Sequence, residues 1–368
     1  MRVYKIEISP TQEQKSIIFR TFDATRLVYN YFIEVNKARY ENGYPYMGNL
    51  EFSKTFNNYM SRLEWVRDKS LKISSKAVKE AMKDADKAYQ RFFKGLSRYP
   101  RFKSRRESRK AYYLCGSIHV KRHAVRLPNL GWVLLKEKNY IPAGSGVVSC
   151  RLIYEGGRFY VLILTQDDNS VNNQLSNDGL GVDVGIRFLA TDSDKDVYPN
   201  INKSSRVKHL KKRLRREQRK LVRRNKKSLR REKTRQIINR IHYKISCICI
   251  DHKNKVVSAL VKKKPSYITV ETLNIKGMLK NRHLSRVIHE QGLHDFMTRL
   301  ANKARQCGIE LRRVSQYFAS SKLCSTCGAK NDPKHKTFWV CTSCGTRHDR
   351  DINASLNLLN ATQYMIDK

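Results

Sequence analysis

Near the end of the chain, four cysteines form two Cys-x-x-Cys-Gly pairs that are separated by 13 residues. They are Cys324, Cys327, Cys341 and Cys344. Two-residue spacing lets both thiolates of a pair face one ion, and the glycine after each pair frees the backbone to turn around it. In a chain without a secretion signal, this pattern indicates a metal site rather than a disulfide framework. Four soft thiolates favour one tetrahedral Zn²⁺ in a structural zinc ribbon, with an iron–sulfur cluster as the alternative.

The other cysteines and the absence of long apolar runs bear on the compartment. No run approaches 18 consecutive apolar residues, and the start lacks the apolar core of a signal peptide. We therefore expect no membrane partner and a reducing compartment, the cytoplasm or nucleoid. The scattered cysteines are expected to be small buried apolar residues. They are Cys115, Cys150, Cys247, Cys249 and Cys307.

The net charge of the chain indicates its partner. Lys and Arg number 75 against 32 Asp and Glu in 368 residues, which gives a formal charge of +43. An excess of this size predicts a polyanion, because neutralising phosphates releases their counterions. A ribosome-associated protein or a basic face on an anionic membrane are the alternatives.

Residues 206–240 concentrate this charge, with 18 Lys or Arg and two acidic residues. Apolar residues such as Val207, Leu210 and Leu214 recur there at helical spacing, with a break near Asn225. A solvated charged face is one interpretation, but unmixed charges repel one another without a polyanion, so we favour nucleic-acid contact. The residues expected to make it are Lys211, Lys212, Arg213, Arg215, Arg216, Arg219, Arg223, Arg224, Arg230 and Arg231.

The order of predicted elements indicates an α+β chain of more than one domain. Residues 2–9 alternate as a half-buried strand does, and a helical pattern then runs from Pro10 to about residue 97. Strand-like segments return at 111–114, 131–135, 147–154 and 158–165. This order suggests a β-barrel-like domain that carries a helical insertion.

A polar, Asn/Ser-rich linker is predicted at 167–178, ahead of a second domain. Its predicted strands are 180–185, 266–271 and 308–314, and an amphipathic helix covers about 286–306. Gly181 and Gly185 permit another element to approach the first of these strands closely.

Three acidic residues stand where these elements would present them inward. Asp183 lies in the middle of the first strand, Glu271 ends the second, and Asp351 begins the last helix. Buried carboxylates are costly unless they are paired or bind metal. Together these three can hold two Mg²⁺ ions that support attack of water on a phosphodiester. Alternatively, each of these residues is a helix cap or an ion-pair partner, and Asp351 in particular suits a helix N-cap. Asp349 is a competing candidate for the metal-binding role of Asp351.

Several motifs together resemble TnpB, the OrfB protein of insertion sequences, which is related to type V CRISPR effectors. They are Gly181-Val-Asp-Val-Gly-Ile, Val270-Glu271-Thr-Leu-Asn274, the two cysteine pairs, and Asp349-Arg-Asp-Ile-Asn-Ala-Ser-Leu-Asn357. Near the start, Pro10-Thr-Gln-Glu-Gln14 and Arg26-Leu-Val-Tyr-Asn30 resemble the opening helices of the family. Tyr99-Pro-Arg-Phe-Lys103 matches a recurrent basic motif. One departure is Ser355, where alanine is usual.

The resemblance implies a domain plan. A RuvC-like nuclease domain of RNase H fold would occupy 178–368, with the zinc ribbon inserted at 320–347. A wedge β-barrel would be formed by 1–9 and 100–170, with a helical recognition domain inserted at 10–99.

The resemblance also implies an activity. Asp183, Glu271 and Asp351 would be the catalytic triad that binds two Mg²⁺ ions, with one Zn²⁺ in the ribbon. A guide RNA from the transposon end would direct cleavage of double-stranded DNA beside a short adjacent motif, in the cytoplasm of a bacterium or archaeon. Base pairing would read most of the target.

Three other functions fit the sequence less well. An RNA-guided DNA-binding repressor is disfavoured because all three carboxylates are present. A compact CRISPR effector is disfavoured because 368 residues is short for that class. A transposase that joins strands itself is disfavoured because no tyrosine or serine recombinase motif is evident.

Overall fold

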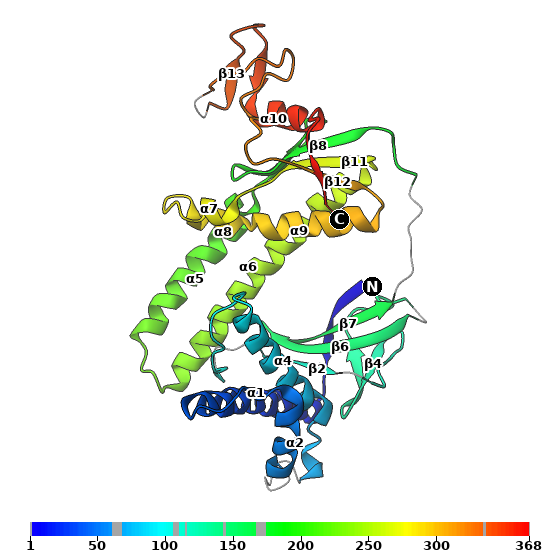
Figure 1. Cartoon of the computed structure of the whole chain (residues 1–368), viewed down its shortest axis with the longest axis vertical. Helices are drawn as coiled ribbons and strands as arrows, with labels where there is room; N and C mark the ends of the chain where they lie inside the picture. The colour runs from blue at the N-terminus through cyan, green and yellow to red at the C-terminus, as the bar shows by residue number, and fades with distance from the viewer. Residues whose placement is uncertain are drawn as a thin grey trace. The chain divides into compact units, whose positions relative to one another are not determined.

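The computed structural model describes residues 2–60, 68–105, 110–114, 116–142, 145–166, 174–333 and 336–367. The chain divides into two compact units, Met1–Asp168 and Asn169–Lys368, each with its own sheet (Figure 1). Most of the predicted linker, 167–173, lies outside the described residues, and 174–178 contain no helix or strand.

The first unit contains a seven-stranded sheet in the order β2-β6-β7-β1-β5-β4-β3. Its strands are β1 (Arg2–Ser9), β2 (Lys110–Leu114), β3 (His119–Val120), β4 (Ala124–Leu127), β5 (Gly131–Leu135), β6 (Gly146–Glu155) and β7 (Arg158–Gln166). All recorded pairings are antiparallel, and β1 pairs with β7 so that Ile6 lies opposite Val161. The first strand of the chain therefore lies inside a sheet built from residues beyond 110. The predicted strands are confirmed, whereas the short β3 and β4 were not predicted.

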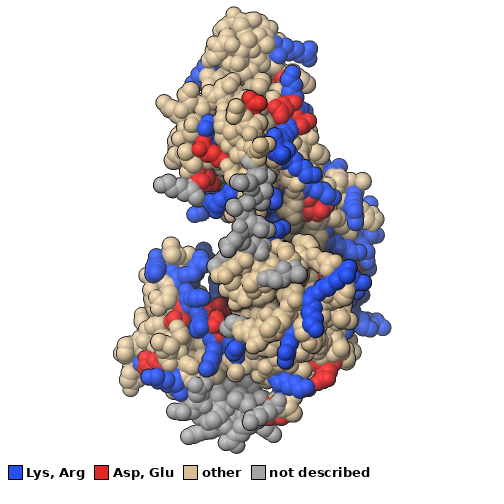
Figure 2. Space-filling model, turned by 90° about the vertical axis from the view of Figure 1, so that its right-hand side faces the viewer, with Lys and Arg blue, Asp and Glu red and all other residues tan. Residues whose placement is uncertain are grey.

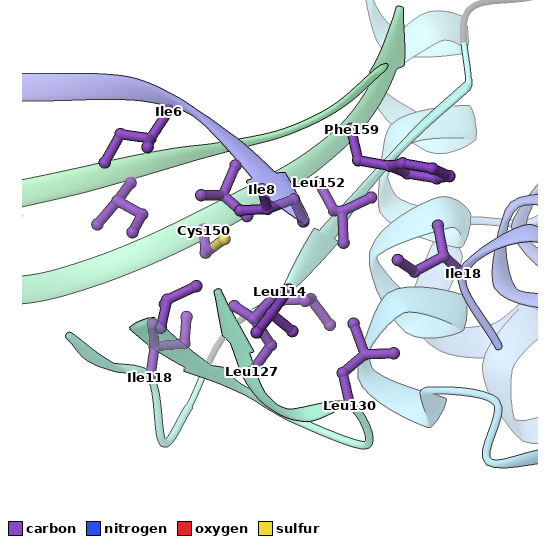
Figure 3. Packing of buried hydrophobic residues seen from close by; sticks show 14 of the residues in the cluster. Ile6, Ile8, Ile18, Leu114, Ile118, Leu127, Leu130, Cys150, Leu152 and Phe159 are labelled. Carbon is purple, nitrogen blue, oxygen red and sulfur yellow. The ribbon is translucent and has the colours of Figure 1, made fainter. Parts of the chain in front are cut away.

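The helices in the described part of this unit lie between β1 and β2 in sequence. They are α1 (Gln12–Glu41), α2 (Asn49–Met60), the 3-10 turn η1 (Lys69–Leu71) and α4 (Ser75–Phe93). Thr11 starts α1 with a capping box, since its hydroxyl accepts from the Gln14 amide and the Gln14 side chain accepts from the Thr11 amide. Ile18 of α1 shares the sheet's core with Ile6 and Leu152 (Figure 3). A helical insertion before the later strands is thus confirmed.

The second unit contains a six-stranded sheet in the order β10-β9-β8-β11-β12-β15. Its strands are β8 (Gly179–Asp183), β9 (Phe188–Asp192), β10 (Val197–Pro199), β11 (Tyr267–Glu271), β12 (Glu310–Val314) and β15 (Met365–Ile366). β8, β11 and β12 are parallel to one another, β9 is antiparallel to both β8 and β10, and β15 is antiparallel to β12. The helices are η2 (Ile201–Lys203, 3-10), α5 (Ser205–Arg223), α6 (Leu229–Lys262), α7 (Ile275–Met278), α8 (Ser285–Gln291), α9 (Leu293–Gln306) and α10 (Arg350–Leu359).

The parallel strands β8 and β11 are mostly apolar and buried, as expected of strands that are covered on both faces. Val182 of β8 and Ile268 of β11 are fully buried in a core shared with Leu260 of α6 and Phe296 of α9. α10 packs against β8, β9 and β11 (Figure 1). This packing places α10 beside the ends of β8 and β11.

Two predicted elements need correction. The amphipathic helix expected over 286–306 is two helices, because Gly292 adopts a left-handed φ of 65° between α8 and α9. The strand that holds Asp183 ends at this residue rather than continuing past it.

The prediction that the scattered cysteines are buried is correct for Cys150 and Cys307. Cys249 is half-buried, and the prediction is wrong for Cys247, which is exposed on α6. Cys115 lies outside the described residues.

Candidate active site

Two parallel strands bring Asp183 and Glu271 to one edge of the sheet. β8 and β11 pair in register, with Val182 opposite Val270, and each strand ends at the carboxylate that follows. The carboxyl ends of parallel strands are where α/β sheets place their ligands. The burial of the apolar residues therefore fixes the register of the two strands, and with it the positions of the two acids.

α10 adds the third carboxylate because it lies directly on β8. A Cβ at Gly181 would overlap the backbone oxygen of Ser355 and lie 2.5 Å from the amide nitrogen of Leu359. The predicted close approach is confirmed here, since no larger residue leaves room for the helix. At Gly185 the nearest atom would be 3.6 Å away, which is ordinary contact, so that glycine is not needed for the approach.

Asp349, not Asp351, is the N-cap of α10. Its Oδ1 accepts hydrogen bonds from the amides of Asp351 at 2.9 Å and Ile352 at 3.2 Å. The interpretation of Asp351 as a cap is therefore wrong, and the side chain of Asp351 is left available to the cleft. The buried hydroxyl of Ser355 donates to the Ile352 carbonyl at 2.7 Å, so serine is satisfied at this position.

Burial raises the pKa of all three acids. Burial, followed by the charges of Asp351 and Glu271, raises the pKa of Asp183 to about 7, although Arg350 opposes this. Burial also raises the pKa of Glu271 and of Asp351, and in Asp351 Arg187 and Arg350 act in the opposite direction. Like charges forced together in this way are relieved by a proton or a cation.

All three carboxylates line one cleft of about 480 Å³. Arg187 and Arg350 line the same cleft and supply positive charge. Among the described residues, the oxygens of the three acids do not all lie within 4.8 Å of one another, whereas the ribbon sulfurs do. The structure thus brings Asp183, Glu271 and Asp351 together around a shared space rather than in direct contact.

The four predicted thiolates form a single cluster. All four sulfurs lie within 4.8 Å of one another, with 3.6 Å between those of Cys324 and Cys344 and 3.7 Å between those of Cys327 and Cys341. The glycine after each pair adopts a left-handed φ, of 74° and 73°, as the turn requires. Four cysteine sulfurs at this spacing suit tetrahedral Zn²⁺.

Two neighbours of the thiolates were not predicted. His348 Nε2 lies 3.1 Å from the sulfur of Cys324, and Asn331 Nδ2 donates to the sulfur of Cys341 at 3.5 Å. The backbone amide of Cys344 is the main group that lowers the pKa of the Cys341 thiol, to about 6. Such donors favour the thiolate form that binds metal. No spacing rule singles out either side chain, although His348 directly precedes Asp349.

The ribbon is joined to the cleft without a linker. β13 (Phe338–Val340) pairs with β14 (Arg347–Asp349), and Asp349 both ends β14 and caps α10. Thr337, just before β13, accepts a hydrogen bond from the Arg187 side chain at 2.9 Å and one from the Arg350 amide at 2.8 Å. Two cleft arginines therefore also hold the base of the ribbon.

The basic segment forms α5 and α6, which pack together as predicted with a break after Arg223. Three of the ten residues expected to bind nucleic acid also make contacts within the fold. Lys211 pairs with Glu290 at 2.7 Å, while Arg224 and Arg231 donate to backbone carbonyls around the α5–α6 turn.

The other seven cations of this set are exposed and form no ion pair within the described ranges. They are Lys212, Arg213, Arg215, Arg216, Arg219, Arg223 and Arg230. Elsewhere too, basic side chains spread over the surface with acidic ones in smaller groups between them (Figure 2). The exposed part of α5 therefore suits contact with phosphates.

The fold and the site together define an α/β protein with a carboxylate cleft at one sheet edge and a four-cysteine ribbon beside it. The chain is similar to the TnpB family, the OrfB proteins of insertion sequences. Residues 162–282 match the OrfB model described as "Probable transposase", and 294–358 match "Cas12f1-like, TNB domain". Residues 1–44 match an OrfB model described as "Helix-turn-helix domain", where the structure has β1 and one continuous helix, α1.

Relatives match over nearly the whole chain. "Putative RNA-guided DNA endonuclease" of Streptomyces pristinaespiralis is 29% identical over 98% of this chain and 89% of its own length. "Putative RNA-guided DNA endonuclease InsQ" of Escherichia coli (strain K12) is 27% identical over 98% of this chain and 92% of its own. A solved CRISPR-Cas12f ternary complex aligns with 97% of this chain and 83% of that chain, at 12% identity and a TM-score of 0.41. Of the helices in the described ranges, none combines the length and apolar character needed to cross a bilayer.

Proposed function

We propose that this protein is a transposon-associated, RNA-guided endonuclease that cleaves double-stranded DNA beside a short adjacent motif. The observation that carries the proposal is the convergence of Asp183, Glu271 and Asp351 on one cleft. It is supported by relatives that align with nearly the whole chain and are named putative RNA-guided DNA endonucleases. The net charge of +43 supports polyanionic partners.

The domain plan is part of the proposal. Residues 178–368 would be a RuvC-like domain of RNase H fold with the ribbon inserted at 320–347, which is supported by the parallel strands β8, β11 and β12 and the antiparallel β9 and β10. Residues 1–9 and 100–170 would be the wedge β-barrel, supported by the pairing of β1 with β5 and β7. The helices in 10–99 would be the recognition insertion.

The donor set of the cleft fits magnesium. Asp183, Glu271 and Asp351 offer only hard oxygen ligands. Burial, and after it the charges of Asp351 and Glu271, raises the pKa of Asp183, as expected of a cation site without its cation. These residues would hold two Mg²⁺ ions, which supply Lewis-acid activation of water and of the phosphodiester when bound. Asp349 orients the helix turn that carries Asp351, and the cleft arginines place positive charge where a phosphate would lie.

The ribbon fits one structural zinc ion. Its four sulfurs come from four cysteines, which leaves no open position for a water molecule. Its role would therefore be to hold β14 and the start of α10 in shape.

The exposed cations of α5 would contact the phosphates of a guide RNA, transcribed from the transposon end, and of the DNA. Base pairing with the guide would then select the target, as in other RNA-guided effectors. A repressor that binds without cleaving is not favoured, because all three carboxylates are in place around the cleft.

The test is to sequence the RNA that co-purifies with the protein and to supply DNA matching its guide segment with Mg²⁺. We expect cleavage by the wild type and none by Asp183→Ala, with RNA and DNA binding retained. Full cleavage by Asp183→Ala would refute the site, and the lack of a defined RNA would refute guidance. Binding without cleavage by the wild type would favour the repressor.

A further inference from the structure

One segment of the first unit combines exposed aromatic rings with an excess of positive charge, in which Arg105 pairs with Asp23. Residues 91–105 contain four aromatic residues, six Lys or Arg and no Asp or Glu. The segment begins with the last three residues of α4 and contains no helix or strand from residue 94 onward. It includes the motif Tyr99-Pro-Arg-Phe-Lys103, which neither the cleft nor the ribbon uses.

The segment is nevertheless held firmly. Asn30 of α1 donates to the Lys103 carbonyl at 3.0 Å and accepts from the Lys103 amide at 2.7 Å. The Lys103 ammonium lies 3.5 Å from the centroid of the Tyr29 ring. The hydroxyls of Tyr99 and Tyr89 are 2.9 Å apart, and their rings meet edge to face. A ligand that binds here would therefore not have to order the backbone.

The side chains between these anchors are left to solvent. Phe102 and Phe93 are each 56% exposed, and Phe102 stacks on no other ring in the described part of the chain. Arg98 and Arg101 are exposed, and within the same described residues neither forms an ion pair. Exposed rings beside hydrated, unpaired cations suit a partner that offers flat apolar faces together with negative charge.

Single-stranded nucleic acid offers both. Its unpaired bases stack on aromatic rings, while its phosphates lie within reach of neighbouring arginines. A duplex hides the faces of its bases and would use only the cations. An apolar protein surface would use the rings but would leave the arginines without partners.

We propose that residues 91–105 form a stacking surface for unpaired bases of single-stranded nucleic acid, with Phe102 as the main platform and Arg98 and Arg101 as phosphate contacts. This inference rests on the proposed function only in taking nucleic acid as the partner. RNA and unwound DNA share the required chemistry, and the binding test separates them.

The test measures binding of labelled single strands of RNA and of DNA by fluorescence anisotropy in EDTA, so that cleavage plays no part. Phe102→Ala should weaken binding of at least one of the two strands about tenfold. An oligonucleotide of the same length without bases should bind the wild type and Phe102→Ala equally. Phe102→Trp should restore affinity for the base-bearing strand, which a merely unfolded segment would not allow.

Tyr140→Ala is the matched control, because Tyr140 is 54% exposed in the same unit and lies outside the segment. It should leave single-strand affinity unchanged. Unchanged binding of both strands by Phe102→Ala, or an equal loss on the strand without bases, would overturn the proposal. Binding in EDTA is independent of DNA cleavage, so a failed cleavage assay would refute the proposed function and leave this surface standing.

Discussion

Gly181→Ala tests whether α10 and its carboxylate are positioned by direct contact with β8. The added methyl would overlap the carbonyl oxygen of Ser355 and lie 2.5 Å from the amide nitrogen of Leu359, where ordinary contact begins at 3.4 Å. Both atoms belong to the backbone of α10, so no side-chain rotation relieves the overlap. The helix must move away from β8 by about 1 Å or more, as the difference between these distances requires.

The expected effect has two parts. Overpacking of this kind lowers the free energy of unfolding by about 1–3 kcal/mol. For a unit of this size, each kcal/mol lowers Tm by about 2–4 °C, which a thermal melt followed by circular dichroism resolves. Asp351 moves with the helix, and a shift of ~1 Å at a reacting group reduces the rate about 100-fold. Single-turnover cleavage with saturating guide and Mg²⁺ measures that loss.

Gly185→Ala serves as the control for stability, because its Cβ would meet its nearest neighbour at 3.6 Å. We expect its Tm to equal that of the wild type. If Gly181→Ala keeps both the wild-type Tm and the wild-type cleavage rate, then α10 is not seated on β8 and the derived position of Asp351 is incorrect.

Three further changes test other parts of the site. Asp183→Asn should raise the Tm of the metal-free protein at about pH 8, and this gain should shrink toward about pH 4, because burial and the neighbouring acids raise the pKa of Asp183 to about 7. Cys324→Ser should remove zinc, measured by mass spectrometry of the metal, and lower Tm. Replacing Arg215, Arg216 and Arg219 together by glutamine should weaken nucleic-acid binding and reduce the slope of log affinity against log salt by about 2–3, measured by anisotropy.

The sign of the first effect follows from linkage. A carboxyl whose pKa is higher in the folded protein than in the unfolded chain destabilises the fold once it ionises, and this cost is complete above the folded pKa. Asparagine removes the cost, so an equal gain at both pH values would contradict the assignment.

Cys307→Ser is the matched control for the ribbon, since it alters a buried cysteine outside it and should keep zinc. Arg224→Gln is the control for α5, and it should lower Tm because Arg224 bonds the α5–α6 turn.

The sequence was sufficient to place Glu271 at the end of a strand and Asp183 on another strand of the same domain, although Asp183 was expected in the middle of its strand rather than at its end. Asp183 and Glu271 each follow apolar residues that are buried only when the strands pair side by side, so a local pattern carries long-range information. The cysteine cluster was predictable for a similar reason, because ligand spacing is a local property that encodes geometry.

Other features depend on contacts that a local pattern does not contain. Asp349 and Asp351 both stand in the first turn of α10, and only the direction of one side chain toward two amides shows which caps it. Lys211 was expected to bind nucleic acid because it resembles its basic neighbours, but its partner Glu290 lies 79 residues further along the chain. Helical periodicity continues through Gly292, whose left-handed φ then separates two helices.

Asp349 belongs to both the ribbon and the cap of α10, and this limits how the protein can be engineered. Because one residue both ends the ribbon and caps α10, there is no spacer in which an added or lost residue is absorbed. One extra residue after Asp349 would turn the helix against its cap by about 100° and direct Asp351 away from its companions. A ribbon exchanged with that of a relative therefore preserves the cleft only if the splice keeps this junction intact. The number of residues at this junction, rather than the composition of the ribbon, decides whether an exchanged ribbon leaves the carboxylates of the cleft in place.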